Sequence, residues 1–176
     1  TRVTLENAHA ELPDPPEGVA HVLPQGRCLV PVEGLSEDQL EAEQRRIRRL
    51  MRPGGADDQA IVVLGAGSVH IRKGVDLFIQ CAARAILEAP EVDYRFVWMG
   101  GGYEPLWDAA YSVYLADQIR RAGLEGHIVF IDESVAIETA YEEADMFLLS
   151  SRLDPLPNVA IESMAFGLPV LCFDKT

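Results

Sequence analysis

From residue 60 to its end, the chain alternates short apolar runs with longer stretches that have helical periodicity. The apolar runs are short and rich in β-branched and aromatic residues, which predicts strands that are buried on both faces. The stretches between them place apolar side chains on one side, which predicts amphipathic helices. Regular alternation of this kind predicts an α/β fold, with a Rossmann-like, doubly wound parallel sheet and right-handed crossovers.

The pattern places each element. The expected strands are residues 61–64, 94–99, 127–131, 145–149 and 169–173, and the expected helices are 74–87, 106–122, 136–143 and 158–166. A further helix is predicted from Glu37 to about Met51, because Ser36 can cap its start, acids occupy its first turn and arginines its last.

Residues 1–35 differ from the rest, because they are rich in proline and glycine and show little periodicity. This predicts an extended lead-in before one domain at residues 36–176. The 176-residue chain has 48% hydrophobic residues, enough for a core. The last expected strand ends close to Thr176, where a covering helix would normally follow, so we expect the natural polypeptide to continue.

Charge and cysteine content narrow the possible partners. A net charge of −13 argues against nucleic acid and anionic lipid as ligands. No apolar run approaches the roughly 20 residues of a membrane span, and no signal peptide is recognisable, so we expect a cytoplasmic protein. The three cysteines, Cys28, Cys81 and Cys172, lack zinc-ligand spacing and suit a reducing compartment.

Ligands of an open parallel sheet bind beyond the carboxyl ends of its strands, and residues 65–74 form the first unusual loop there. Gly65 and Gly67 allow a ligand close to the backbone, and Arg72 and Lys73 precede a helix whose first amides suit phosphate. The alternative is a tight turn with exposed basic side chains, and spacing leaves both open. The loop lacks the third glycine of a dinucleotide fingerprint, which disfavours a dehydrogenase.

Two further loops lie at the same predicted edge. Gly100-Gly101-Gly102 leaves room for a bulky group or forms a mere flexible loop. In residues 150–162, Pro157 suits the first turn of a helix, and Glu162 is expected to point back toward the crevice that holds Asp154. Two carboxylates near a helix N-terminus stay ionised and accept hydrogen bonds from sugar hydroxyls. The alternative is one capping Asp and one surface Glu.

The run Asp154-Pro155-Leu156-Pro157-Asn158-Val159-Ala160-Ile161-Glu162, continued to Gly167-Leu168-Pro169-Val170, resembles the donor-site signature of glycosyltransferase family 4, which has the GT-B fold. That signature has two acids eight positions apart, a helix of small residues and a Gly-Leu-Pro-Val end. Further segments are similar to this family: His21-Val22-Leu23-Pro24-Gln25-Gly26, Arg72-Lys73-Gly74-Val75-Asp76, Gly100-Gly101-Gly102 and Ala144-Asp145-Met146-Phe147-Leu148-Leu149-Ser150. The resemblance covers residues 20–176.

The resemblance implies a nucleotide-sugar as donor substrate. Lys73 would contact its diphosphate, Asp154 the transferred sugar and Glu162 the ribose, with Lys73 and Asp154 as catalytic residues. The implied donor-binding residues are Gly67, Ser68, Arg72, Lys73, Gly100, Gly101, Gly102, Ile131, Val135, Leu156, Pro157, Asn158, Val159 and Glu162. Two positions depart from the family pattern, because Asp154 replaces the commoner Glu and Ser68 stands where the family often has arginine. Arg72 is the candidate to replace that charge.

The implied activity is that of a retaining hexosyltransferase of glycan biosynthesis that needs no metal or other cofactor. Its acceptor would be a glycan, a lipid or a small molecule. The N-terminal GT-B domain would lie outside this chain, as would any part that contacts a membrane peripherally, so the isolated domain is expected to be inactive. Two alternatives remain. One is a non-catalytic, flavodoxin-like interaction module. The other is half of a GT-B epimerase or phosphorylase, which the two-acid signature fits less well.

Overall fold

The structure is a computed structural model, and it describes residues 35–108, 110–154 and 156–174 of the chain. Most of the expected lead-in at residues 1–35, and all of the segment at residues 21–26 that resembles an interdomain strand, lie outside the described residues.

The described residues form one parallel sheet of five strands in the order β3-β2-β1-β4-β5. The strands are β1 (Ile61–Ala66), β2 (Tyr94–Met99), β3 (Ile128–Ile131), β4 (Met146–Leu149) and β5 (Val170–Cys172). The α-helices are α2 (Glu37–Met51), α3 (Val75–Glu88), α4 (Tyr111–Arg121), α5 (Ile137–Glu143) and α6 (Asn158–Ala165), and short 3-10 turns occupy Gly55–Asp57 and Ile71–Lys73. The expected α/β class is confirmed.

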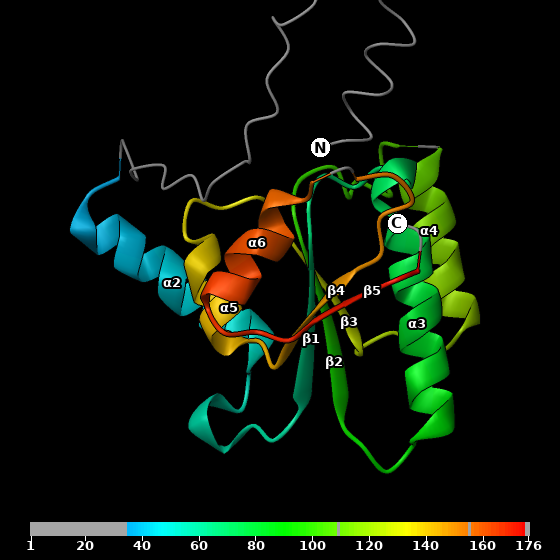
Figure 1. The fold of residues 1–176 in the computed structure, drawn as a ribbon, viewed down its shortest axis with the longest axis horizontal. Helices are drawn as coiled ribbons and strands as arrows, with labels where there is room; N and C mark the ends of the chain where they lie inside the picture. The colour runs from blue at the N-terminus through cyan, green and yellow to red at the C-terminus, as the bar shows by residue number, and fades with distance from the viewer. Residues whose placement is uncertain (1–34, 109, 155, 175–176) are drawn as a thin grey trace, which may run out of the picture.

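Helices cover both faces of the sheet (Figure 1), with α3 and α4 on one side and α2, α5 and α6 on the other. The side chains of β1 alternate accordingly. Val62 and Leu64 join the core beneath α2, α5 and α6. Val63 packs with Phe78 of α3 and Leu115 of α4. Burial on both faces explains why the strands are continuous apolar runs.

The start of α2 agrees with the sequence analysis. The Ser36 hydroxyl accepts a hydrogen bond from the Gln39 amide at 3.3 Å, and the Gln39 side chain accepts one from the Ser36 amide at 2.9 Å. This reciprocal arrangement is a capping box, which satisfies two amides that the first helical turn leaves without partners. The helix ends at Met51, as predicted, and buries Ile47 and Met51 against the sheet.

Helix α4 begins at Tyr111, five residues later than the predicted start at residue 106. Leu106 and Trp107 supplied the apolar pattern behind that prediction, yet they are 88% and 84% exposed. The Asp108 carboxylate, two residues before the N-cap Ala110, accepts a hydrogen bond from the Ser112 amide at 2.8 Å and so satisfies one amide of the first helical turn. The prediction of this boundary was therefore wrong, because periodicity cannot tell an exposed apolar loop from a helical face.

The strand order locates the binding edge. After β1 the chain builds β2 and β3 on one side of β1, and then crosses back to place β4 and β5 on the other side. The direction of winding thus reverses between β1 and β4. In open parallel sheets, ligands bind in the crevice at such a switch point, beyond the carboxyl ends of the strands. The segments that follow β1 and β4 are the ones that the sequence analysis singled out.

Candidate functional site

The turn before α3 and the loop after β4 lie in direct backbone contact. Gly74 has a left-handed φ of 68°, and a Cβ atom added to it would lie 2.0 Å from the Ser150 carbonyl oxygen. The Arg152 amide donates to the Arg72 carbonyl at 2.9 Å, and the Ser150 hydroxyl donates to the Lys73 carbonyl at 3.2 Å. Only glycine allows this approach, which joins the two loops at the switch point.

This contact brings together three of the predicted site residues. Lys73 Nζ lies 2.5 Å from Asp154 Oδ2, and the two side chains are 16% and 10% exposed. Arg72 Nη1 lies 3.9 Å from the other Asp154 oxygen and donates to the Leu153 carbonyl at 3.1 Å. Ser151 adds a hydroxyl donor 3.3 Å from Asp154. The site therefore contains two cations and a carboxylate at one edge of the sheet.

The glycine loops pack beside this cluster. A Cβ atom on Gly67 would lie 3.4 Å from the Cδ and Cε atoms of Lys73, so the lysine stem runs along the Gly67 backbone. The Trp98 indole donates to the Gly67 carbonyl at 2.9 Å, and the Val69 amide donates to the Gly101 carbonyl at 2.8 Å. A Cβ atom added to Gly100 would lie only 2.1 Å from the Gly67 carbonyl oxygen. The loops after β1 and β2 are thus hydrogen-bonded to each other, and Ser68 lies between two of the bonded residues.

Two of the implied donor-binding residues, Ile131 and Val135, lie at the end of β3 and in the segment that follows it. Ile131 ends the strand with its side chain in the core, and its carbonyl accepts a hydrogen bond from the Gly100 amide at 2.8 Å. Val135 is exposed beyond it. One strand position earlier, Phe130 stacks on Tyr103 with ring centroids 3.7 Å apart and planes 7° apart. A flat aromatic pair thus lies beside the loop after β2.

Helix α6 carries the second acid of the signature. The helix runs back from the carboxyl edge of the sheet to β5, so its N-terminus lies at the same edge as the carboxyl ends of β1 and β4 (Figure 1). Pro157 immediately precedes its first residue, Asn158, and Leu156 and Val159 are half-buried beside them.

The structure pairs Glu162 with Tyr141 of α5, whose hydroxyl donates to the carboxylate at 3.0 Å. Burial and the Glu162 charge raise the pKa of Tyr141 well above its usual value, so this phenol stays protonated as a donor. Glu162 is thus held by a donor from α5.

The site also contains a cluster that the sequence analysis missed. Asp76 of α3 is buried and forms a two-pronged ion pair with Arg152, and it accepts a hydrogen bond from Tyr111 of α4. Burial disfavours the ionised form, but the bonds from Arg152 and Tyr111 outweigh this effect and hold the pKa of Asp76 below its usual value. Burial also raises the pKa of Tyr111 to about 12. Only the acid within the Lys-Gly-Val-Asp turn hinted at this cluster.

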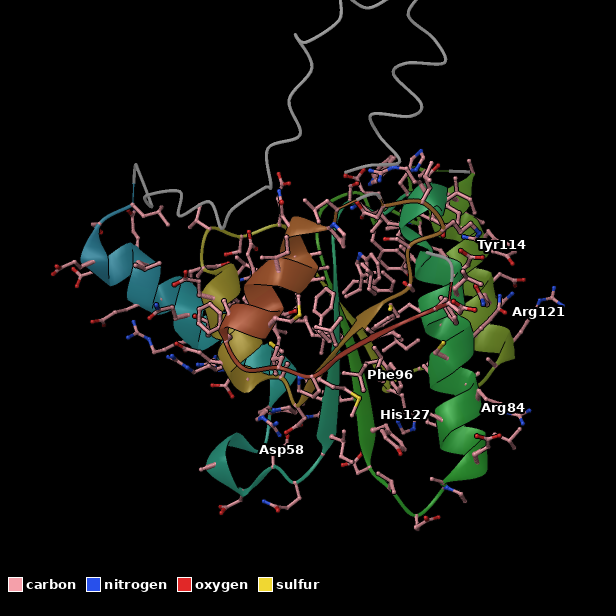
Figure 2. The ribbon with its side chains drawn as sticks, viewed as in Figure 1. Asp58, Arg84, Phe96, Tyr114, Arg121 and His127 are labelled. Carbon is pink, nitrogen blue, oxygen red and sulfur yellow. The ribbon has the colours of Figure 1, made fainter. Side chains whose placement is uncertain are left out.

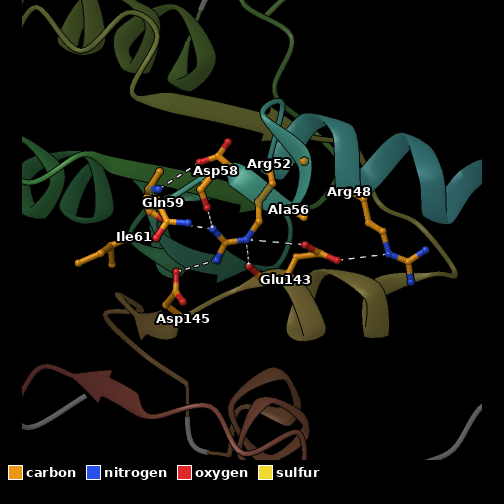
Figure 3. Close-up of a pocket in the computed structure, with 10 residues that line it drawn as sticks. Arg48, Arg52, Ala56, Asp58, Gln59, Ile61, Glu143 and Asp145 are labelled. Carbon is orange, nitrogen blue, oxygen red and sulfur yellow. Dashed lines mark hydrogen bonds and ion pairs between the residues drawn. The ribbon is translucent and has the colours of Figure 1, made fainter.

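A hollow with a volume of about 570 Å³ lies elsewhere, at the amino ends of the strands (Figure 3). Its charged residues pair with one another. Arg52 donates to Asp145 at 2.8 Å and to the Glu143 carbonyl at 3.1 Å, and Arg48 lies 3.2 Å from Glu143. Asp145 also accepts from the Val62 amide. These mutually satisfied charges join α2 and α5 to β1, so we interpret the hollow as structural.

No group of three or more His, Cys, Asp or Glu residues in the described part of the chain could hold a metal ion. Among the helices that the structure describes, none has both the length and the apolar character that crossing a bilayer requires.

Known proteins share this fold and sequence pattern. Mannosylfructose-phosphate synthase of Agrobacterium fabrum is 32% identical over 114 residues, which are 62% of this chain and 24% of that protein. Alpha-galactosylglucosyldiacylglycerol synthase of Streptococcus pneumoniae is 29% identical over 139 residues, which are 74% of this chain and 33% of that protein. The chain thus spans a third or less of the length of these relatives.

A solved structure of similar fold is Anabaena HepE in complex with UDP and glucose, with a TM-score of 0.58 and 21% identity over 78% of this chain and 34% of that chain. The profile of the family described as glycosyl transferases group 1 matches residues 59–176. That match includes β1 to β5 and both loops that meet at the switch point. The chain therefore belongs to the group 1 glycosyl transferases, with the α/β architecture of a GT-B domain.

Proposed function

We propose that this chain binds the nucleoside diphosphate sugar of a retaining glycosyltransferase. The observation that carries the proposal is the contact between Lys73 and Asp154 at the switch point of the sheet, with Arg72 beside it. Cations at this place suit a diphosphate, and a carboxylate suits sugar hydroxyls. The structure of Anabaena HepE with UDP and glucose supports this ligand class.

Lys73 and Asp154 would have different roles in the reaction. When the bond between the anomeric carbon and the phosphate oxygen breaks, negative charge collects on the departing nucleoside diphosphate. Lys73, assisted by Arg72, would stabilise that charge, which is the main electrostatic task of such a site. Asp154 would accept a hydrogen bond from the transferred hexose, and Glu162 one from the ribose. On this proposal no metal takes part, because the two cations supply the positive charge.

The relatives are at least three times as long as the part that matches. On this proposal, the acceptor site is therefore part of a longer protein. We expect the chain alone to bind donor without transferring the sugar. The donor edge of a domain holds only one of the two substrates, and transfer requires both to be positioned together.

Lys73→Ala tests the diphosphate role. We expect about ten- to a hundredfold weaker binding of nucleoside diphosphates, because a charged hydrogen bond is lost and Asp154 keeps only the more distant Arg72 as a positive neighbour. Calorimetry with UDP, GDP and ADP measures the effect.

Arg84→Ala is the matched control, because it removes one positive charge from the exposed side of α3. Figure 2 shows Arg84 on the outer side of this helix. It should leave the affinity unchanged. Equal affinities for Lys73→Ala and the unaltered chain would end the diphosphate assignment. If the unaltered chain binds none of the three nucleotides, the non-catalytic interaction module becomes the better reading.

Asp154→Asn should have the opposite effect on free nucleotide. In the structure Lys73 is already paired with Asp154, so a diphosphate must compete with that carboxylate. The amide removes the competitor, and we expect binding of the nucleoside diphosphate to tighten about three- to tenfold. The gain in affinity that the attached sugar provides should disappear at the same time. Calorimetry with UDP and UDP-glucose separates the two effects, and a variant that weakens UDP would contradict the competition.

A further inference from the structure

A second ion pair of the site involves no group that the proposed ligand would touch. Arg152 Nη1 lies 2.7 Å from Asp76 Oδ1, and Arg152 Nη2 lies 2.6 Å from Asp76 Oδ2. The Asp76 side chain is 7% exposed and the Arg152 side chain 38%, so the carboxylate is largely removed from water while the guanidinium remains partly solvated. A guanidinium that meets a carboxylate through two parallel bonds fixes the orientation of both groups as well as their distance.

The pair has hydrogen-bond partners on two further segments of the chain. From α4, the Tyr111 hydroxyl donates to Asp76 at 2.8 Å and accepts from the Asp76 amide at 3.1 Å, while Gln118 donates to the Asp76 carbonyl at 3.0 Å. From the turn before α3, the Ile71 carbonyl accepts from Arg152 at 2.9 Å. The cluster thus ties that turn and the loop after β4 to each other and to α4.

The position of the pair along the chain connects it to the proposed ligand groups. Asp76 follows Lys73 by three residues, and Arg152 precedes Asp154 by two. The pair therefore fixes the two short backbone segments from which Lys73 and Asp154 project. A ligand held from both sides needs these segments at the correct separation, and an error of about 1 Å can cost on the order of a hundredfold in rate.

Fold stability alone explains this cluster poorly. The cost of removing water from a buried ion pair offsets much of its attraction, so an apolar replacement often serves stability as well or better. Directional hydrogen bonds that join the turn before α3, the loop after β4 and α4 are suited instead to fixing how these segments are placed.

We propose that Asp76 and Arg152, supported by Tyr111, are positioning residues that set the separation between Lys73 and Asp154 for the donor diphosphate. The inference rests on the proposed function. Asp76→Asn keeps the size of the side chain but removes its charge, and it should weaken nucleoside diphosphate binding about tenfold. Arg152→Lys keeps the charge but not the two-pronged geometry, and it should weaken binding about threefold. The second variant disturbs the core less, because Arg152 lies nearer the surface.

The chain offers a matched control in the ion pair between Asp58 and Arg95. Their atoms are 2.7 Å apart, and the Asp58 side chain is 6% exposed, close to the value for Asp76. Figure 2 shows Asp58 at the edge of the sheet opposite the site. Asp58→Asn should therefore lower the thermal midpoint of unfolding as Asp76→Asn does, and leave nucleotide affinity unchanged.

A double-mutant cycle decides whether the pair acts through Lys73. The affinity for UDP, GDP and ADP is measured by calorimetry for the unaltered chain, Lys73→Ala, Asp76→Asn and the double variant. If Asp76 positions Lys73, Asp76→Asn should add less than twofold to the loss already caused by Lys73→Ala. Additive losses would overturn the proposal, and so would an Asp76→Asn affinity equal to that of Asp58→Asn. A Lys73→Ala variant with unchanged affinity would instead refute the proposed function, and with it the inference.

Discussion

Gly74→Ala is expected to destabilise the chain by about 3–5 kcal/mol, a size seen when a substitution forces a backbone clash in addition to an unfavourable φ. The left-handed φ of 68° alone disfavours alanine, and the new Cβ atom would lie 2.0 Å from the Ser150 carbonyl oxygen. That oxygen belongs to the backbone after β4, so it cannot move aside as the end of a side chain can. Urea unfolding measures the loss of stability.

Gly123→Ala separates the two causes of this loss. Gly123 has a φ of 66°, almost the same as Gly74, but nothing lies within 4 Å of an added Cβ atom. Its replacement should cost about 1–2 kcal/mol, the cost of the left-handed conformation by itself. The difference between the two variants therefore reports the contact between the two loops. Similar losses in both would show that the loops are free to separate.

Gly100→Ala is the second substitution with a large expected effect, again about 3 kcal/mol or more. Gly100 has a φ of 152°, and its added Cβ atom would lie 2.1 Å from the Gly67 carbonyl oxygen. Because the same oxygen accepts the hydrogen bond from Trp98, displacing it also breaks a bond in the core. The Lys73 side chain lies along the Gly67 backbone. Displacing Gly67 should therefore also displace Lys73 and weaken nucleotide binding.

Gly101→Ala is the matched control one residue away. Its φ is not in the left-handed range, and the nearest atoms belong to the Glu133 side chain at 3.7 Å, an ordinary contact. Thermal unfolding with and without UDP should show a large fall in midpoint for Gly100→Ala and a small one for Gly101→Ala. Equal falls in the two midpoints would mean that the close contact between Gly100 and Gly67 does not determine the stability of this loop.

The sequence predicted the strands well, because burial on both faces leaves a continuous apolar run that polar loops interrupt. It also predicted that Lys73 and Asp154 belong to one site, through the resemblance of two separate motifs to one family. It could not predict the partner of Asp76. Arg152 lies 76 positions away, and the two meet only because β4 pairs with β1, a neighbour relation that alternation of strands and helices does not specify.

Glu162 is a second residue whose partner could not be predicted from the sequence. The N-terminal lean of helical side chains predicts a carboxylate that faces the crevice with Asp154, and the structure adds a hydrogen bond from Tyr141 that the sequence did not indicate. Helical periodicity predicts the side of α6 from which Glu162 projects. It does not predict that α5 places a buried phenol within reach, because that depends on how the two helices pack.

The chain returns to pair with β1 only after β2 and β3, and this affects the order in which the site forms during synthesis. Lys73 and Asp154 are 81 positions apart, and β2 and β3 are completed between them. Because synthesis runs from the N-terminus, a nascent chain exposes the lysine and the glycine loops before their acidic counterpart has left the ribosome. Ligand recognition by this sheet would thus be acquired only when β4 inserts beside β1, after β2 and β3 have been made.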